Sequence, residues 1–261
     1  MDCLEQNTEL LEVYQKHPCR TLPNAYWKTE RSLVELEVCL HKDSFGDASG
    51  LALWGEEKMM ALWCRKHADC PFTRRELAAY SFILVHDDAL SLFNGFTYDR
   101  REPYFRIIHK GEPPVYNCPT HYHYADVNPD ADLEAIAGVI RECYPGSAMT
   151  AAEVRGWLDH PVYAPTLWVW AVETSTGKRA GLGIAEMDAA VGEASVEWVQ
   201  VLPDEQGKGL GKALVAEILR RVAGKVAFTT VSGREDNETH PERLYRRCGF
   251  TGSDVWWLLA K

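Results

Sequence analysis

A change in the spacing of apolar residues marks the most strongly patterned part of this chain. Residues 196–201 (VEWVQV) are rich in β-branched and aromatic side chains, which predicts a strand. Pro203 ends it, because proline cannot donate a ladder hydrogen bond. After Pro203 the spacing becomes that of an amphipathic helix, whose apolar residues recur every four positions: Leu210, Leu214, Ile218 and Val222. We therefore expect a strand, a short loop and a helix.

Shorter segments of both kinds fill the rest of the chain. Before residue 117 we expect a helix that ends near Pro18, together with a hairpin over 49–66 and strands over 33–40 and 104–109. After residue 120 we expect helices over 130–146 and 150–158 and one beginning near His240, and five further strands, over 121–127, 167–173, 180–187, 226–231 and 255–259. The last strand is expected to close the C-terminal sheet. This rhythm predicts a mixed α+β or α/β fold.

A proline-rich connection divides the chain. Pro113, Pro114 and Pro119 make residues 111–119 stiff and non-helical. We expect an accessory α+β domain over residues 1–117 and a second domain over 118–261. A chain of 261 residues allows either one large domain or two small ones.

Composition and charge exclude several classes of protein. A hydrophobic content of 46% is typical of a globular chain, and the formal charge of −10 argues against binding duplex nucleic acid. No stretch is apolar for long enough to span a bilayer, so we expect no membrane partner. The N-terminus lacks the basic start and apolar core of a signal peptide, which predicts a cytoplasmic protein. The oligomeric state is left open.

The cysteines and histidines do not form a recognisable metal-binding pattern. The eight cysteines are scattered, and no C-x-x-C motif is present, so we expect reduced thiols. Two groups lie close together in sequence, although neither has the spacing of a zinc site: Cys64, His67 and Cys70, and Cys118, His121 and His123. We expect no metal site.

The loop between the predicted strand and helix is rich in glycine. Gln206-Gly207-Lys208-Gly209-Leu210-Gly211-Lys212 lies where the free N–H groups of a helix N-terminus point outward, which indicates an anion-binding cradle. It is not a Walker A loop, because Ala213 replaces the required Ser or Thr. Its G-x-G-x-G spacing also differs from the dinucleotide-binding G-x-G-x-x-G.

With the preceding strand, this loop resembles the acetyl-CoA-binding motif of the GNAT superfamily of N-acetyltransferases, V-x-V-x-P followed by Q/R-G-x-G-x-G/A. Residues 244–250 (LYRRCGF) resemble the second signature of that family. The resemblance covers about 121–261 and implies a GNAT fold: a mixed, mainly antiparallel sheet flanked by helices, with two hairpins before the glycine loop. It implies acetyl-CoA as co-substrate, held by Val199, Val201, Gln206, Gly207, Lys208, Gly209, Leu210, Gly211 and Lys212.

The resemblance also implies catalytic roles. A backbone N–H, which we assign to Val199, would stabilise the oxyanion, and the Tyr245 hydroxyl would protonate the CoA sulfur. Many family members use a glutamate on this strand as general base, which corresponds to Glu197. Strand alternation is expected to place Glu197 on the same face as Val199. Glu186 and Asp188 are alternatives, and some relatives use no dedicated base.

The resemblance implies transfer of an acetyl or longer acyl group to a primary amine of a small molecule or peptide. Two other functions remain open: a non-catalytic acetyl-CoA-binding or sensor module whose N-terminal half binds a partner, and a zinc-stabilised interaction protein. No glycine loop occurs before residue 118. The N-terminal half is therefore either a degenerate acetyltransferase-like copy or a small α+β domain that shapes the substrate side.

Overall fold

The computed structural model describes residues 3–66, 69–144 and 146–261. The chain forms two compact units, and each contains segments that are distant in sequence. The first comprises residues 1–108, 232–242 and 252–261, and the second comprises residues 109–231 and 243–251. This division differs from the expected split after residue 117, since two C-terminal segments belong with the N-terminal half.

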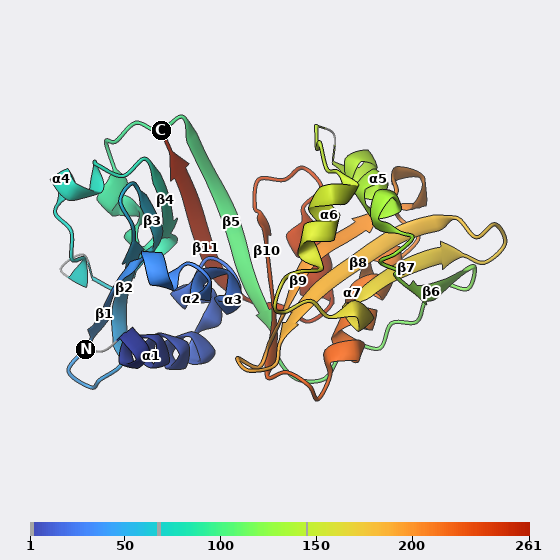
Figure 1. The fold of residues 1–261 in the computed structure, drawn as a ribbon, viewed down its shortest axis with the longest axis horizontal. Helices are drawn as coiled ribbons and strands as arrows, with labels where there is room; N and C mark the ends of the chain where they lie inside the picture. The colour runs from blue at the N-terminus through green and yellow to red at the C-terminus, as the bar shows by residue number, and fades with distance from the viewer. Residues whose placement is uncertain (1–2, 67–68, 145) are drawn as a thin grey trace. The chain divides into compact units, whose positions relative to one another are not determined.

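The first unit is built on a sheet in the order β1-β2-β3-β4-β11-β5 (Figure 1). Its strands are β1 (Glu37–Lys42), β2 (Ala48–Trp54), β3 (Lys58–Cys64), β4 (Phe82–His86), β5 (Arg100–His109) and β11 (Thr251–Ala260). Its helices are α1 (Cys3–Lys16), α2 (Pro18–Thr21), α3 (Tyr26–Glu30) and α4 (Arg74–Leu77). The predicted hairpin is confirmed as β2 and β3. The strand expected over 33–40 begins late, because residues 33–35 form a 3-10 turn.

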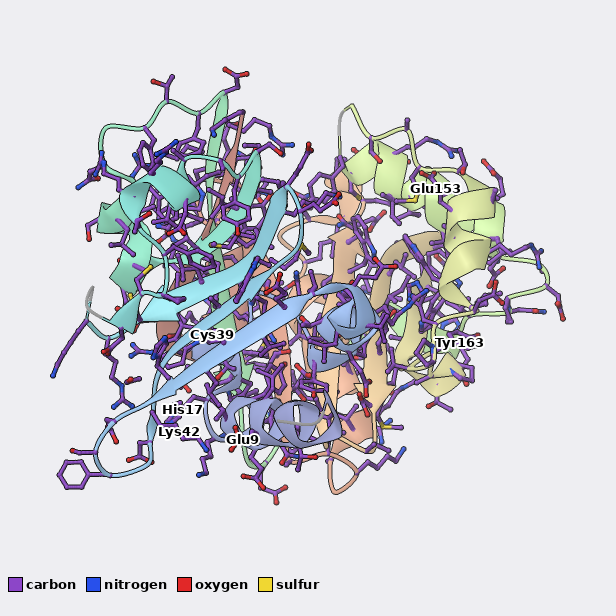
Figure 2. All side chains as sticks on the ribbon, turned by 60° about the vertical axis from the view of Figure 1, so that its left-hand side comes forward. Glu9, His17, Cys39, Lys42, Glu153 and Tyr163 are labelled. Atoms are coloured by element: carbon purple, nitrogen blue, oxygen red, sulfur yellow. The ribbon has the colours of Figure 1, made fainter. Side chains whose placement is uncertain are left out.

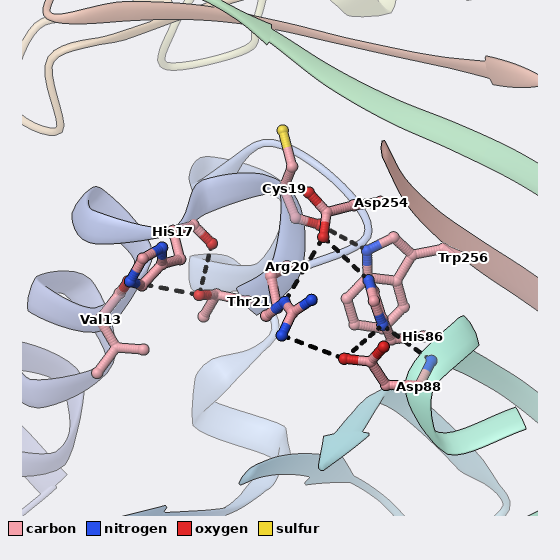
Figure 3. Close-up of polar contacts among 9 residues, drawn as sticks. All are labelled: Val13, His17, Cys19, Arg20, Thr21, His86, Asp88, Asp254 and Trp256. Carbon is pink, nitrogen blue, oxygen red and sulfur yellow. Dashed lines mark hydrogen bonds and ion pairs between the residues drawn. The ribbon is translucent and has the colours of Figure 1, made fainter. Parts of the chain in front are cut away.

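Contacts of the C-terminal strand explain why it belongs to the first unit. β11 pairs antiparallel with β4 from Trp256↔His86 to Ala260↔Phe82. Figure 3 shows two side-chain contacts that accompany this ladder: His86 Nε2 lies 3.1 Å from Asp254 Oδ1, and the Trp256 indole donates to the Cys19 carbonyl at 2.8 Å. The strand expected over 255–259 therefore exists, but it extends the N-terminal sheet. At the edge of this unit, Lys42 of β1 pairs with Glu9 of α1 at 2.9 Å (Figure 2).

The second unit contains a sheet in the order β10-β9-β8-β7-β6. Its strands are β6 (Tyr122–Asp126), β7 (Trp168–Glu173), β8 (Arg179–Asp188), β9 (Glu193–Val201) and β10 (Phe228–Arg234). Its helices are α5 (Leu133–Cys143), α6 (Ala151–Trp157), α7 (Leu210–Val222) and α8 (Pro241–Arg247). β10 runs parallel to β9, and the other pairs are antiparallel. The predicted mixed, mainly antiparallel sheet flanked by helices is confirmed.

Helices cover both faces of this sheet. Apolar residues of α5 pack with Leu182 and Ile184 of β8 on one face. On the other face, a side chain at Gly183 would meet Ile218 of α7 at 3.1 Å, so glycine lets that helix approach closely. α6 begins with the predicted capping box, in which the Glu153 carboxylate (Figure 2) accepts from the Thr150 N–H at 2.7 Å.

Three further findings concern metal ligands, membrane-spanning helices and cysteines. Within the described ranges, no three His, Cys, Asp or Glu side chains are grouped so that they could hold a metal ion, and His67 lies outside those ranges. No helix that is described has the length and apolar character needed to cross a membrane. The cysteines with described side chains are free thiols.

Candidate active site

Strand β9 is irregular on one side and open on the other. Ile184 and Ala185 of β8 pair with Trp198 and Val196, so Glu197 is the extra residue of a β-bulge. The parallel ladder with β10 ends at Val196. In the described part of the chain, residues 198–201 of β9 pair only with β8. Half of their backbone groups therefore face an open strand edge.

The direction of these groups follows from the hydrogen bonds next to them. The Leu202 N–H donates to the Ala180 carbonyl at 3.0 Å, on the β8 side. Because backbone groups alternate sides along a strand, the N–H and C=O of Val199 and Val201 point to the open edge. Consistent with this, the Val201 carbonyl accepts from Gln206 Nε2 at 3.2 Å instead of from β8. An extended ligand with amide groups can pair with this edge as an added strand.

The three glycines after β9 have different structural roles. Gly207 and Gly209 have φ of +77° and +88°, a left-handed conformation that favours glycine. Gly209 is the N-cap of α7. Gly211 lies in the first turn, where a side chain would lie 3.3 Å from Leu244 of α8. The loop therefore turns tightly, and the first N–H groups of a 13-residue helix face outward.

A pocket of 470 Å³ opens at this helix N-terminus. Its lining comprises Val201, Glu205, Gln206, Gly207, Gly209, Leu210, Gly211, Lys212, Leu244 and Arg247. All the residues predicted to bind the donor line this pocket except Val199, which lies further along β9, and Lys208. Glu205, Leu244 and Arg247 were not predicted to bind the donor: Glu205 lies just before the glycine loop, and the second signature, which contains Leu244 and Arg247, was used only to assign Tyr245.

Lys208 points to a carboxylate instead of the pocket. Its Nζ lies 2.8 Å from Glu205, which also accepts from Lys178 at 3.1 Å and from the Tyr122 hydroxyl at 2.6 Å. These hydrogen bonds, that of Lys208 foremost, then those of Tyr122 and Lys178, lower the pKa of Glu205 to about 2. Lys208 and Lys178 thus share one buried carboxylate, whose single negative charge balances one of the two ammonium groups.

Replacing Glu205 with glutamine is expected to lower the melting temperature most at neutral pH. The folded-state pKa is below the value of about 4.3 for an unfolded glutamate, so the stabilisation is present above pH 4–5 and is lost as the pH falls toward 2. A loss of about 1 kcal/mol would lower Tm by roughly 2–4 °C at pH 7. Thermal unfolding from pH 7 to pH 2 measures this. Glu134→Gln, at an exposed ion pair, is the control. A Tm difference that does not narrow toward pH 2 would contradict the assignment.

Glu197 lies on the face of the sheet opposite to the Val199 side chain, which differs from the expected shared face. The Ser195 hydroxyl donates to Glu197 Oε1 at 2.6 Å. Ser195 pairs with Glu186, two residues from Ile184 and therefore on the face packed by α5. Val199 pairs with Gly183, on the α7 face. The bulge at Glu197 breaks the alternation on which the expectation was based.

Tyr245 of α8 is 8% exposed, and its ring packs edge-on against Phe250 at 5.6 Å. Burial raises the pKa of its hydroxyl well above 10, and Tyr144, Cys248 and the Glu197 carboxylate add smaller contributions. Tyr245 therefore remains protonated at neutral pH and can act as a proton donor.

The alternative carboxylates have structural contacts elsewhere. Glu186 Oε1 lies 2.6 Å from His160 Nδ1. Asp188 accepts from the N–H groups of Ala190 and Val191 at 3.0 and 3.1 Å, which shapes the turn between β8 and β9. Glu197 likewise accepts from Ser195, so all three carboxylates have a partner, and the role of Glu197 as base stays a prediction.

Comparisons with known proteins agree with the motifs. Residues 165–252 match the model of the acetyltransferase (GNAT) domain, which spans both signatures. A sequence search of curated proteins found no match. A GCN5-related N-acetyltransferase from Sphaerobacter thermophilus superposes with a TM-score of 0.61 and 18% identity, over 86% of this chain and 80% of that one.

Two other solved structures are similar along nearly the whole chain. A GNAT-family acetyltransferase from Colwellia psychrerythraea has a TM-score of 0.63 and 11% identity, covering 100% of this chain and 98% of its own. A tandem GNAT protein from the clavulanic acid biosynthesis pathway has a TM-score of 0.53 and 15% identity, covering 98% and 95%. The N-terminal half therefore also matches GNAT structures. This chain has the GNAT fold, and its residues 165–252 match the GNAT acetyltransferase domain.

Proposed function

We propose that this protein transfers an acetyl group from acetyl-CoA to a primary amine of a small molecule or peptide. The main observation in support is that the pocket at the N-terminus of α7 adjoins the open edge of β9, since Val201 belongs to both. The amide groups at 206–212 suit a diphosphate. The backbone groups of Val199 and Val201 suit the amides of a pantetheine arm. We assign the chemistry to the second unit and an accessory role to the first.

The reaction needs a base, an oxyanion donor and an acid. The Glu197 carboxylate takes a proton from the amine, directly or through water, and the amine nitrogen attacks the thioester carbonyl carbon. The Val199 N–H, which points to the open edge, donates to the oxyanion. When the carbon–sulfur bond breaks, the Tyr245 hydroxyl gives its proton to the leaving thiolate. Glu197 then releases its proton to solvent, and the Tyr245 phenolate takes up a proton from solvent. Both side chains are thereby restored, and the products are an amide and a thiol.

Replacing Tyr245 with phenylalanine is expected to lower kcat about 10²-fold and to leave CoA affinity unchanged, since only the proton donor is removed. Thiol release from acetyl-CoA, measured against a panel of amines, reports kcat, and calorimetry reports affinity. Phenylalanine preserves the ring packing against Phe250, so the fold is retained. A wild-type protein that binds CoA and releases no thiol with any amine would favour a sensor module and refute the enzymatic proposal.

A further inference from the structure

The cations around the donor pocket fall into two groups. Lys178 and Lys208 are held by Glu205. Lys212 and Arg247 both line the pocket, and neither side chain has a carboxylate partner among the residues that the structure describes. In a chain with a formal charge of −10, two uncompensated cations beside one pocket indicate a site for an anion.

An aromatic residue of the proline-rich connection lies against the Lys212 ammonium and the Arg247 backbone. Lys212 Nζ is 4.4 Å from the centroid of the Tyr116 ring. The Tyr116 hydroxyl donates to the Arg247 carbonyl at 3.4 Å. A side chain at Gly209 would lie 3.9 Å from Pro119. The connection therefore runs beside the pocket, and Tyr116, which is 38% exposed, offers part of its ring to a ligand.

We propose that Tyr116, Lys212 and Arg247 bind the nucleotide end of the donor, with the 3′-phosphate near the two cations and the adenine on the Tyr116 ring. This proposal rests on the proposed function. In that function the loop amides hold the diphosphate and β9 holds the pantetheine arm. These two parts of the donor therefore do not need Lys212 or Arg247. The remaining anionic group of a CoA thioester is its 3′-phosphate, which would pair with Lys212 and Arg247.

This site makes the protein selective for its acyl donor. The phosphopantetheine arm of an acyl-carrier protein carries the same thioester and lacks both the adenine and the 3′-phosphate. With the nucleotide site, free CoA thioesters bind more tightly than carrier-bound ones. Tyr116 would then be a donor-specificity residue, contributed by a segment outside both signatures.

Calorimetry of the full chain with CoA and with 3′-dephospho-CoA tests the proposal. The wild type is expected to bind CoA about 10-fold or more tightly, as for a charge-assisted contact. Arg247→Ala should reduce that ratio severalfold, and Arg247→Lys should restore most of it. Arg243→Ala, at an exposed position of the same helix that does not line the pocket, should leave it unchanged.

The Tyr116 ring has its own test. Tyr116→Ala should weaken CoA and dephospho-CoA alike, by about 5- to 100-fold if adenine stacks on the ring, and should leave 4′-phosphopantetheine binding unchanged. Tyr116→Phe should behave as the wild type does. Equal wild-type affinities for CoA and dephospho-CoA, together with normal turnover, would overturn this proposal and leave the proposed function intact. Binding of neither nucleotide would overturn both.

Discussion

Replacing Glu197 with glutamine is expected to lower kcat about 10²- to 10⁴-fold, the range for loss of a general base. Glutamine keeps the size of the side chain and can still accept from Ser195, so the bulge should persist. CoA affinity should stay within about twofold, because Glu197 does not line the donor pocket. Thiol release at saturating acetyl-CoA measures the rate.

A matched control is available on the neighbouring strand. Asp188→Asn alters a carboxylate that shapes the β8–β9 turn, and it should leave kcat near the wild-type value. If Glu197→Gln retains full activity, the amine is taken up in its neutral form and the protein has no dedicated base. That result would remove Glu197 from the mechanism and leave the donor site unaffected.

Replacing Gly209 with valine is expected to weaken CoA binding by more than about 100-fold. A β-branched residue at φ +88° is strained by roughly 1–3 kcal/mol, and relief of that strain would reorient the amides at the start of α7. In the proposed site several of these amides hold the diphosphate together, so reorienting them should weaken binding more than the loss of one side chain does. Calorimetry with CoA measures the affinity.

Gly177→Val separates this effect from general instability. Gly177 has φ +72° in the turn between β7 and β8, with no atom within 4 Å of its side-chain position, and it does not line the pocket. Both variants should lower Tm by similar amounts, and only Gly209→Val should lower the affinity for CoA. Equal CoA affinity in the two variants would contradict the assignment of the loop.

The glycine loop over residues 206–212 was predictable because its signals are local. Proline, glycine spacing and the helical period of α7 each depend on a few neighbouring residues, and the structure confirms the strand, loop and helix over 193–222. The capping box at Thr150 is also local and was predicted correctly. Signals of this kind are read directly from consecutive residues.

The remaining features depend on pairing between distant segments. The bulge at Glu197 inserts a single residue into the ladder. The alternation of side chains that predicts a strand gives no sign of where such an extra residue lies. The strand over 255–259 has the same apolar pattern whichever sheet it joins, so its pairing with β4 was not predictable. Likewise, the sequence places both Lys208 and Lys212 in the loop, but only the structure shows that Lys208 pairs with Glu205 while Lys212 lies against the Tyr116 ring.

Titration of the full chain with CoA in a calorimeter tests the central claim most directly. We expect one site per chain, because only the second unit has a glycine loop, with a dissociation constant on the order of micromolar to submillimolar, as for typical substrates. Binding should be more than about 100-fold weaker in Gly209→Val and normal in Gly177→Val. No detectable binding by the wild type at millimolar CoA would show that the amides at the N-terminus of α7 do not hold a CoA diphosphate.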